Sequence, residues 1–167
     1  MDVEEYLHTS FEPECEFLDG GLVDRYAGDL PHSTTMANMI FRLQALRARL
    51  GVRALPIIRI CITPTRYRVA DVAVWRDDNL GDARIPTVPP FLAVEILSPE
   101  DRMTRMLPKI QEYLAFGIEY VWLIDPEEKS ALIFTHESPG GSVVADILRT
   151  TNPAIEIPLA SAFDLDS

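Results

Sequence analysis

Two carboxylates and one lysine in this sequence have the residue types and spacing needed for metal-assisted hydrolysis of a phosphodiester. Asp71 lies in the middle of the apolar segment 67–75, and Glu95 lies in the middle of the apolar segment 91–98. Both segments predict β-strands. An unpaired carboxylate is costly to bury, so each acid is expected to have a metal ion, a cationic partner or a shifted pKa. Lys109 follows in the first turn of a predicted helix.

Strand alternation gives the two acids defined faces. Successive side chains point to opposite sides, so Asp71 shares a face with Ala73, and Glu95 shares one with Ala93. If the strands pair, the carboxylates converge and suit Mg²⁺, a hard cation that prefers oxygen ligands. The alternative is that each acid pairs with an arginine from the basic segment 30–70. The combination of both acids with Lys109 favours the metal site.

Lys109 is one of only two lysines, with Lys129, in a chain that has 15 Lys and Arg residues together. A compact ammonium can orient or deprotonate a water and neutralise a developing oxyanion. The alternative is a solvated surface lysine, although helix electrostatics do not favour a cation in a first turn.

Charge is unevenly distributed along the chain. The net charge of −11 argues against a nucleic-acid partner, because phosphate affinity comes mostly from Lys and Arg. Residues 30–70 nevertheless contain no acid and seven arginines, at positions 42, 47, 49, 53, 59, 66 and 68. These form either a phosphate-facing patch or solvent faces that pair with acids elsewhere. Arg42 and Arg49 are seven residues apart and share a helix face, so both are candidate substrate-binding residues.

Length and composition indicate a single domain, 1–167, with a core of its own. No apolar segment approaches the ~20 residues that span a bilayer, and the acidic segment 1–5 does not resemble a signal peptide. We therefore expect a soluble cytoplasmic protein with no membrane partner. Cys15 and Cys61 belong to no metal or redox motif and are expected to be small, free thiols.

The pattern of apolar residues and turn residues predicts an α/β or α+β layer structure, with a mixed sheet flanked by helices. Ser33 or Thr34 is the expected cap of the first helix, Gly51 its stop, and Pro108 is expected in the first turn of the second helix. In chain order the predicted elements are a hairpin at 15–26 about Asp19-Gly20, a helix at 33–50, strands at 53–63 and 67–75, a mobile loop at 76–90, a strand at 91–98, a helix at 104–116, and strands at 120–125, 131–135, 143–148 and 153–163.

Three other residues are weaker candidates. Glu16, on the first hairpin, is either a third carboxylate of the site or a solvent-facing acid. His32 is a phosphate contact, a helix cap or a core residue. Ser98 either contacts substrate or begins the Ser-Pro turn, and no base is placed to make it a nucleophile.

Several long segments resemble the Uma2 family, which is restriction-endonuclease-like and belongs to the PD-(D/E)XK nuclease superfamily. They are RVADVAVW at 68–75, PFLAVEILSPEDR at 90–102, KIQEYLAFG at 109–117 and YVWLIDP at 120–126. The resemblance extends over nearly the whole chain. It implies a restriction-endonuclease-like mixed sheet between helices, with an N-terminal β-hairpin, and Mg²⁺-dependent phosphodiester hydrolysis.

The resemblance also implies residue roles. Asp71 and Glu95 match the superfamily's first and second acids, and the main-chain carbonyl of Ile96 is a further candidate metal ligand. Superfamily members often have lysine two residues after the second acid, where this chain has Leu97, and the Uma2-like pattern supplies Lys109 instead. Glu16 matches an acid of the N-terminal hairpin.

Two positions depart from the family pattern. Ala70 replaces the usual proline before the first acid, which leaves the ligand intact, and Gly21 stands where relatives often have a glutamate. His32 matches a histidine at the helix start.

The leading hypothesis is a Mg²⁺-dependent endonuclease acting on DNA, with Mn²⁺ as a possible substitute and a possible homodimer. One alternative is a catalytically silent binding or regulatory protein that keeps the fold. The other is a metal-dependent hydrolase of RNA or of small phosphoesters.

Overall fold

A computed structural model describes residues 1–164 of the 167-residue chain. Its elements, in chain order, are α1 (Val3–Leu7), β1 (Cys15–Leu18), β2 (Gly21–Asp24), α2 (Leu30–Ala45), α3 (Arg47–Leu50), β3 (Val52–Thr63), β4 (Arg66–Arg76), β5 (Leu92–Ile96), α4 (Met103–Phe116), β6 (Tyr120–Asp125), β7 (Ser130–Phe134), β8 (Ser142–Val143), β9 (Ile147–Thr150), β10 (Ile155–Pro158) and the 3₁₀ helix η1 (Leu159–Ala162). Within the described residues, no helix is long and apolar enough to cross a membrane.

The main sheet has eight strands in the order β2-β1-β4-β5-β6-β7-β8, with β3 pairing β4. Only β5 and β6 run parallel, and α4 makes the crossover between them. β4 organises the sheet, because it pairs with β3 along its length, with β1 through Arg66 and Tyr67, and with β5 through 72–74. The predicted mixed sheet flanked by helices is therefore confirmed.

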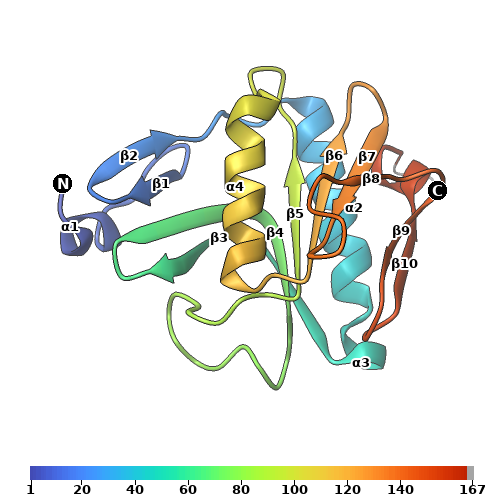
Figure 1. The fold of residues 1–167 in the computed structure, drawn as a ribbon, viewed down its shortest axis with the longest axis horizontal. Helices are drawn as coiled ribbons and strands as arrows, with labels where there is room; N and C mark the ends of the chain where they lie inside the picture. Colours follow the sequence, from blue (N-terminus) through green and yellow to red (C-terminus); the bar gives the residue numbers. More distant parts are fainter. Residues whose placement is uncertain (165–167) are drawn as a thin grey trace.

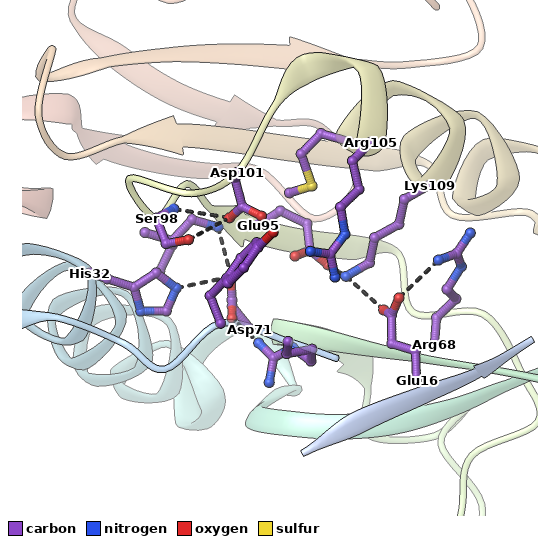
Figure 2. Close-up of a pocket in the computed structure, with 13 residues that line it drawn as sticks. Glu16, His32, Arg68, Asp71, Glu95, Ser98, Asp101, Arg105 and Lys109 are labelled. Atoms are coloured by element: carbon purple, nitrogen blue, oxygen red, sulfur yellow. Dashed lines mark hydrogen bonds and ion pairs between the residues drawn. The ribbon is translucent and has the colours of Figure 1, made fainter. Parts of the chain in front are cut away.

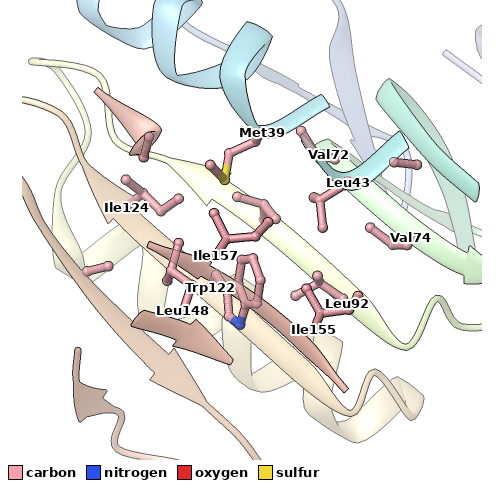
Figure 3. Close-up of a cluster of buried hydrophobic side chains, with 14 of the residues drawn as sticks. Met39, Leu43, Val72, Val74, Leu92, Trp122, Ile124, Leu148, Ile155 and Ile157 are labelled. Carbon is pink, nitrogen blue, oxygen red and sulfur yellow. The ribbon is translucent and has the colours of Figure 1, made fainter. Parts of the chain in front are cut away.

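Helices cover both faces of this sheet (Figure 1). α4 lies on one face, where Ile110 and Leu114 pack against Ala93 of β5 and Val121 of β6. On the opposite face lie α2 and the separate β9–β10 pair. Figure 3 shows the core there, and its labelled residues are Met39, Leu43, Val72, Val74, Leu92, Trp122, Ile124, Leu148, Ile155 and Ile157. The strands between the two helices are therefore covered on both sides, and nearly every residue of β4 and β5 is buried.

Most predicted elements are present, with shifted boundaries. The hairpin, the long β3–β4 pair and the strand at 120–125 are confirmed, and both cysteines are free. The loop before β5 contains no helix or strand. The predicted strand at 143–148 is wrong as a single element, because β8 and β9 belong to different sheets. The predicted helix at 33–50 begins earlier, at Leu30, and is interrupted at Leu46 before α3.

The predicted position of Pro108 is also wrong. α4 begins at Met103, so Pro108 is its sixth residue and lies inside the helix, and Lys109 is not in the first turn. Proline there leaves the carbonyl four residues earlier without its helical partner. The turn before Pro108 places Met106, which is 5% exposed, in the core beneath the helix.

The start of α2 provides a test of local structure. The side chain of Asp29, not of Ser33 or Thr34, caps the helix by accepting a hydrogen bond of 3.0 Å from the main-chain N–H of His32. We expect Asp29→Ala to lower the free energy of unfolding by about 1 kcal/mol. Ser33→Ala, the matched control inside the helix, should change it by no more than a few tenths. Urea denaturation of both variants measures this, and equal costs would contradict the assignment.

Candidate active site

The two strand carboxylates meet where β4 and β5 separate. The pairing of these strands ends at Val72↔Val94, so the next position brings Asp71 opposite Glu95 on the same face. Asp71 extends into the gap between the strands, and its Oδ2 accepts a hydrogen bond of 2.8 Å from the main-chain N–H of Ile96. Both acids are only 2% exposed. β4 can leave β5 here because its first residues pair with β1 instead.

Lys109 connects these strands to the N-terminal hairpin. Its Nζ lies 3.1 Å from Oε1 of Glu95, 2.8 Å from Oε1 of Glu16 and 2.9 Å from the carbonyl oxygen of Val69. An ammonium has three N–H donors, and these contacts use all three. Tyr113, one helical turn after Lys109, donates its hydroxyl to Oε1 of Glu95 at 2.8 Å. Two side chains of α4 therefore fix the orientation of the Glu95 carboxylate.

Glu16 is a buried acid, and both of its carboxylate oxygens have hydrogen-bond donors beside them. Besides Lys109, it accepts hydrogen bonds from the main-chain N–H of Val69 at 3.0 Å and from Arg68 at 2.8 Å (Figure 2). Arg68 in turn contacts Glu112 of α4 at 2.5 Å. This network joins β1, β4 and α4, so it positions Lys109 relative to Glu95.

Asp71 has two basic residues as partners on its other side. Arg25 forms an ion pair with Oδ1. Nε2 of His32 lies 3.5 Å from Oδ2 (Figure 2). His32 reaches the site from the first turn of α2. The alternative interpretation, in which an arginine from 30–70 pairs with each acid, is wrong for Asp71, since its arginine partner precedes that segment.

The charges in the site follow from burial and these contacts. Burial raises the pKa of Glu95, Lys109 opposes this effect, the nearby Asp71 adds to it, and the resulting pKa is about 7. Burial also raises the pKa of Asp71, but His32 and Arg25 outweigh it and hold the pKa below its usual value.

Lys109 and Glu16 stabilise each other's charge. Burial lowers the pKa of Lys109, but Glu16 and Glu95 outweigh this effect and raise it. Burial raises the pKa of Glu16, but Lys109 and Arg68 reverse the shift and bring it to about 2. Lys109 is therefore an ammonium at neutral pH, which favours stabilisation of negative charge over deprotonation of a water.

These side chains enclose a cavity of about 40 Å³, which we call the site pocket. It has room for an ion or a few waters, so a larger substrate would contact it only at its opening. The pocket is lined by Glu16, Arg25, Tyr26, His32, Arg68, Asp71, Glu95, Ile96, Ser98, Asp101, Arg105, Met106 and Lys109.

The site pocket brings together most of the candidates from the sequence. They are Glu16, His32, Asp71, Glu95, Ile96, Ser98 and Lys109. Arg42 and Arg49 are not among the lining residues. The hydroxyl of Ser98 donates to Oδ2 of Asp101 at 3.1 Å, as expected for a turn residue.

The arginines of 30–70 do not converge on this pocket, and only Arg68 lines it. Within residues 1–164, at least five of the seven contact carboxylates, which matches the interpretation that they pair with acids elsewhere. The pairs are Arg47 and Arg53 with Asp77, Arg59 with Glu14, Arg66 with Asp19 and Glu112, and Arg68 with Glu16 and Glu112.

Two functional contacts were missed from the sequence. Arg25 follows a short strand with no periodic signal, and only the path of the chain brings it to Asp71. Tyr113 was not among the candidate residues, yet its hydroxyl contacts Glu95. Its spacing of four residues from Lys109 was the available signal, because residues four apart share a helix face.

The donor set is small but fits a hard divalent cation. Residues 1–164 contain no group of three or more His, Cys, Asp or Glu side chains arranged to hold a metal ion. The site pocket offers two carboxylates, from Asp71 and Glu95, with Ile96 beside them. Mg²⁺ keeps several waters and commonly binds through one or two carboxylates together with substrate phosphate oxygens, so this donor set suits it.

Comparison with known proteins gives a family and a fold. Residues 3–166 match the model of the Uma2 family, described as "Putative restriction endonuclease". The crystal structure of a "putative nuclease belonging to DUF820" from Anabaena variabilis ATCC 29413 is similar, with a TM-score of 0.84 and 20% identity over 98% of this chain and 97% of that chain. At this identity the similarity shows a shared fold.

Other comparisons add little. The cryo-EM structure of a DrdV–DNA complex has a TM-score of 0.40 and 13% identity, over 73% of this chain and 10% of that chain. That similarity is too low to support an argument. No curated protein matches the sequence.

Proposed function

The chain belongs to the Uma2 family of restriction-endonuclease-like proteins, and we propose that it is a Mg²⁺-dependent endonuclease that hydrolyses phosphodiester bonds of DNA. The observation that carries the proposal is the arrangement around Glu95. This buried carboxylate lies opposite Asp71 across the β4–β5 gap and 3.1 Å from the ammonium of Lys109. Structural ion pairs alone rarely bury two acids side by side, because each raises the cost of ionising the other.

Each residue has a distinct role in the proposal. Asp71 and Glu95, with the carbonyl of Ile96, would hold the cation. When bound, the cation supplies a Lewis acid that polarises the phosphate and lowers the pKa of a bound water. Lys109 keeps a positive charge beside Glu95, where it stabilises negative charge that develops on the phosphate. Glu16 is a positioning residue, since it acts through its contact with Lys109.

Nucleic-acid cleavage tests this function. Supercoiled plasmid DNA and a single-stranded RNA are incubated with Mn²⁺ and either wild type or Glu95→Gln. We expect wild type to cleave the DNA and Glu95→Gln to be at least about 100-fold slower. Glu156→Gln is the matched control, because Glu156 is an exposed glutamate of β10 that pairs with Arg149. It should cleave like wild type.

The other outcomes would select the alternative functions. Cleavage of RNA alone, lost in Glu95→Gln, would assign the site to RNA. Absence of cleavage by wild type, with retained DNA binding, would favour a silent binding protein. The homodimer stays a prediction.

A further inference from the structure

Arg25 is a buried cation at the site pocket that uses little of its hydrogen-bonding capacity. It lies in the segment that joins β2 to α2, and its side chain is 14% exposed. Within residues 1–164 its hydrogen bond to Oδ1 of Asp71 comes from Nη2, and Nε and Nη1 donate to no protein atom. Nε and Nη1 are not fully buried, because neither is among the buried polar atoms that lack a partner. These donors are therefore open to water in the pocket.

Arg25 also contacts Oδ1 of Asp71, the oxygen that a metal cation at Asp71 would need as its ligand. Oδ2 of Asp71 is already engaged by the N–H of Ile96 and faces His32, so Oδ1 is the oxygen left for a metal. A divalent cation on Oδ1 would repel the guanidinium at close range. The ion pair with Asp71 and cation binding at Asp71 therefore compete with each other.

The residues on either side of Arg25 hold its backbone beside the pocket. Arg105 of α4 donates a hydrogen bond to the carbonyl oxygen of Asp24, and its guanidinium lies 5.0 Å from the ring centroid of Tyr26. Both neighbours are thus attached to α4. Arg25 can leave Asp71 by rotation of its side chain while its Cα stays in place.

We propose that Arg25 is a substrate-binding residue that exchanges partners, leaving Asp71 when a divalent cation binds and contacting a non-bridging phosphate oxygen of the nucleic acid instead. The proposal rests on the proposed function and adds a residue that its metal site does not include. The planar fork of a guanidinium matches carboxylate and phosphate equally well. The exchange also limits the rise in positive charge, since the phosphate that Arg25 contacts adds a negative charge when the divalent cation enters at Asp71.

The salt dependence of DNA binding tests this exchange. The affinity of a fluorescein-labelled DNA duplex is measured by anisotropy over a range of NaCl concentrations, once with Ca²⁺, used as a hard cation in place of Mg²⁺, and once with EDTA. With Ca²⁺, the slope of log K against log[NaCl] should be smaller by about 0.9 for Arg25→Gln than for wild type, because one phosphate contact is lost. With EDTA the two slopes should be equal, since Arg25 then stays on Asp71.

Two further variants control for charge and folding. Arg149→Gln removes an exposed arginine that also pairs with a carboxylate, and its slopes should match wild type in both buffers. Arg25→Lys retains the charge and should keep the wild-type slope with Ca²⁺. By isothermal titration, Arg25→Gln should bind Mn²⁺ at least about fivefold more tightly than wild type.

Several results would overturn the proposal. Equal slopes for wild type and Arg25→Gln with Ca²⁺ would show that Arg25 makes no phosphate contact. A slope that is smaller by the same amount with Ca²⁺ and with EDTA would show that Arg25 does not exchange partners when the cation binds. Either result leaves the nuclease proposal intact if wild type binds Mn²⁺ and cleaves DNA. If neither wild type nor Arg25→Gln binds Mn²⁺, the metal site itself is wrong and both proposals fail.

Discussion

Replacing Asp71 with asparagine is expected to abolish Mn²⁺ binding and to reduce DNA cleavage by at least about 100-fold. The amide removes the negative charge from the proposed metal site, yet its oxygen can still accept the hydrogen bond that Asp71 receives from the N–H of Ile96. The variant should therefore fold. Isothermal titration with Mn²⁺ measures binding, and plasmid cleavage measures activity.

The control for this variant is Asp77→Asn. Asp77 is an aspartate next to β4 that pairs with Arg47 and Arg53, away from the site pocket. Its replacement removes the same charge and should leave Mn²⁺ affinity unchanged. If Asp71→Asn bound Mn²⁺ with wild-type affinity, the cation would bind elsewhere and the site assignment would be wrong.

Replacing Lys109 with methionine is expected to lower the free energy of unfolding by about 3–5 kcal/mol in EDTA. Glu16 and Glu95 are buried, and both contact the Lys109 ammonium. Without it Glu16 keeps Arg68 and Glu95 keeps the Tyr113 hydroxyl, so each acid must either carry a less compensated charge or take up a proton, and each choice costs free energy. Urea denaturation measures the loss. The double variant Lys109→Met/Glu16→Gln should recover part of it, because it removes one of these two charges.

The matched control is the chain's other lysine. Lys129 is exposed in the turn between β6 and β7, so Lys129→Met should change the free energy of unfolding by less than about 0.5 kcal/mol. A similar small effect in Lys109→Met would show that the network around Glu16 and Glu95 does not depend on this ammonium. The variant should also lose cleavage even where it remains folded, because the positive charge beside the phosphate is gone.

Much of the site could be predicted from strand alternation. Asp71 and Glu95 each interrupt an apolar strand, and β-strand geometry alone puts each on a known face. That these strands pair was a reasonable expectation, and the observed register at Val72↔Val94 places the two acids opposite each other. Lys109 was expected to be the third member; its ammonium lies 3.1 Å from Oε1 of Glu95, and its catalytic role stays a prediction.

Local rules failed where burial decided the structure. Pro108 should mark a first helical turn, but α4 begins five residues before it, and Met106 in that turn packs in the core. Ser33 is a good capping residue in the sequence, yet Asp29 caps the helix and brings His32 into its first turn, within reach of Asp71. Asp29 satisfies the capping preference as well as Ser33 does, so that preference alone does not choose between them.

The sequence by itself determined the chemical groups and their faces. Side-chain direction in strands and helices depends only on near neighbours, so two carboxylates on apolar strands and one lysine on the next helix could be identified. Tertiary structure alone decided which groups meet. Pairing of β1 with β4 brings Glu16 to Lys109, and the segment after β2 brings Arg25 to Asp71. Such contacts join residues far apart in the chain, and they depend on the register of every strand between them. The charge state of the site also depends on them, since burial and long-range partners together set the pKa of each acid.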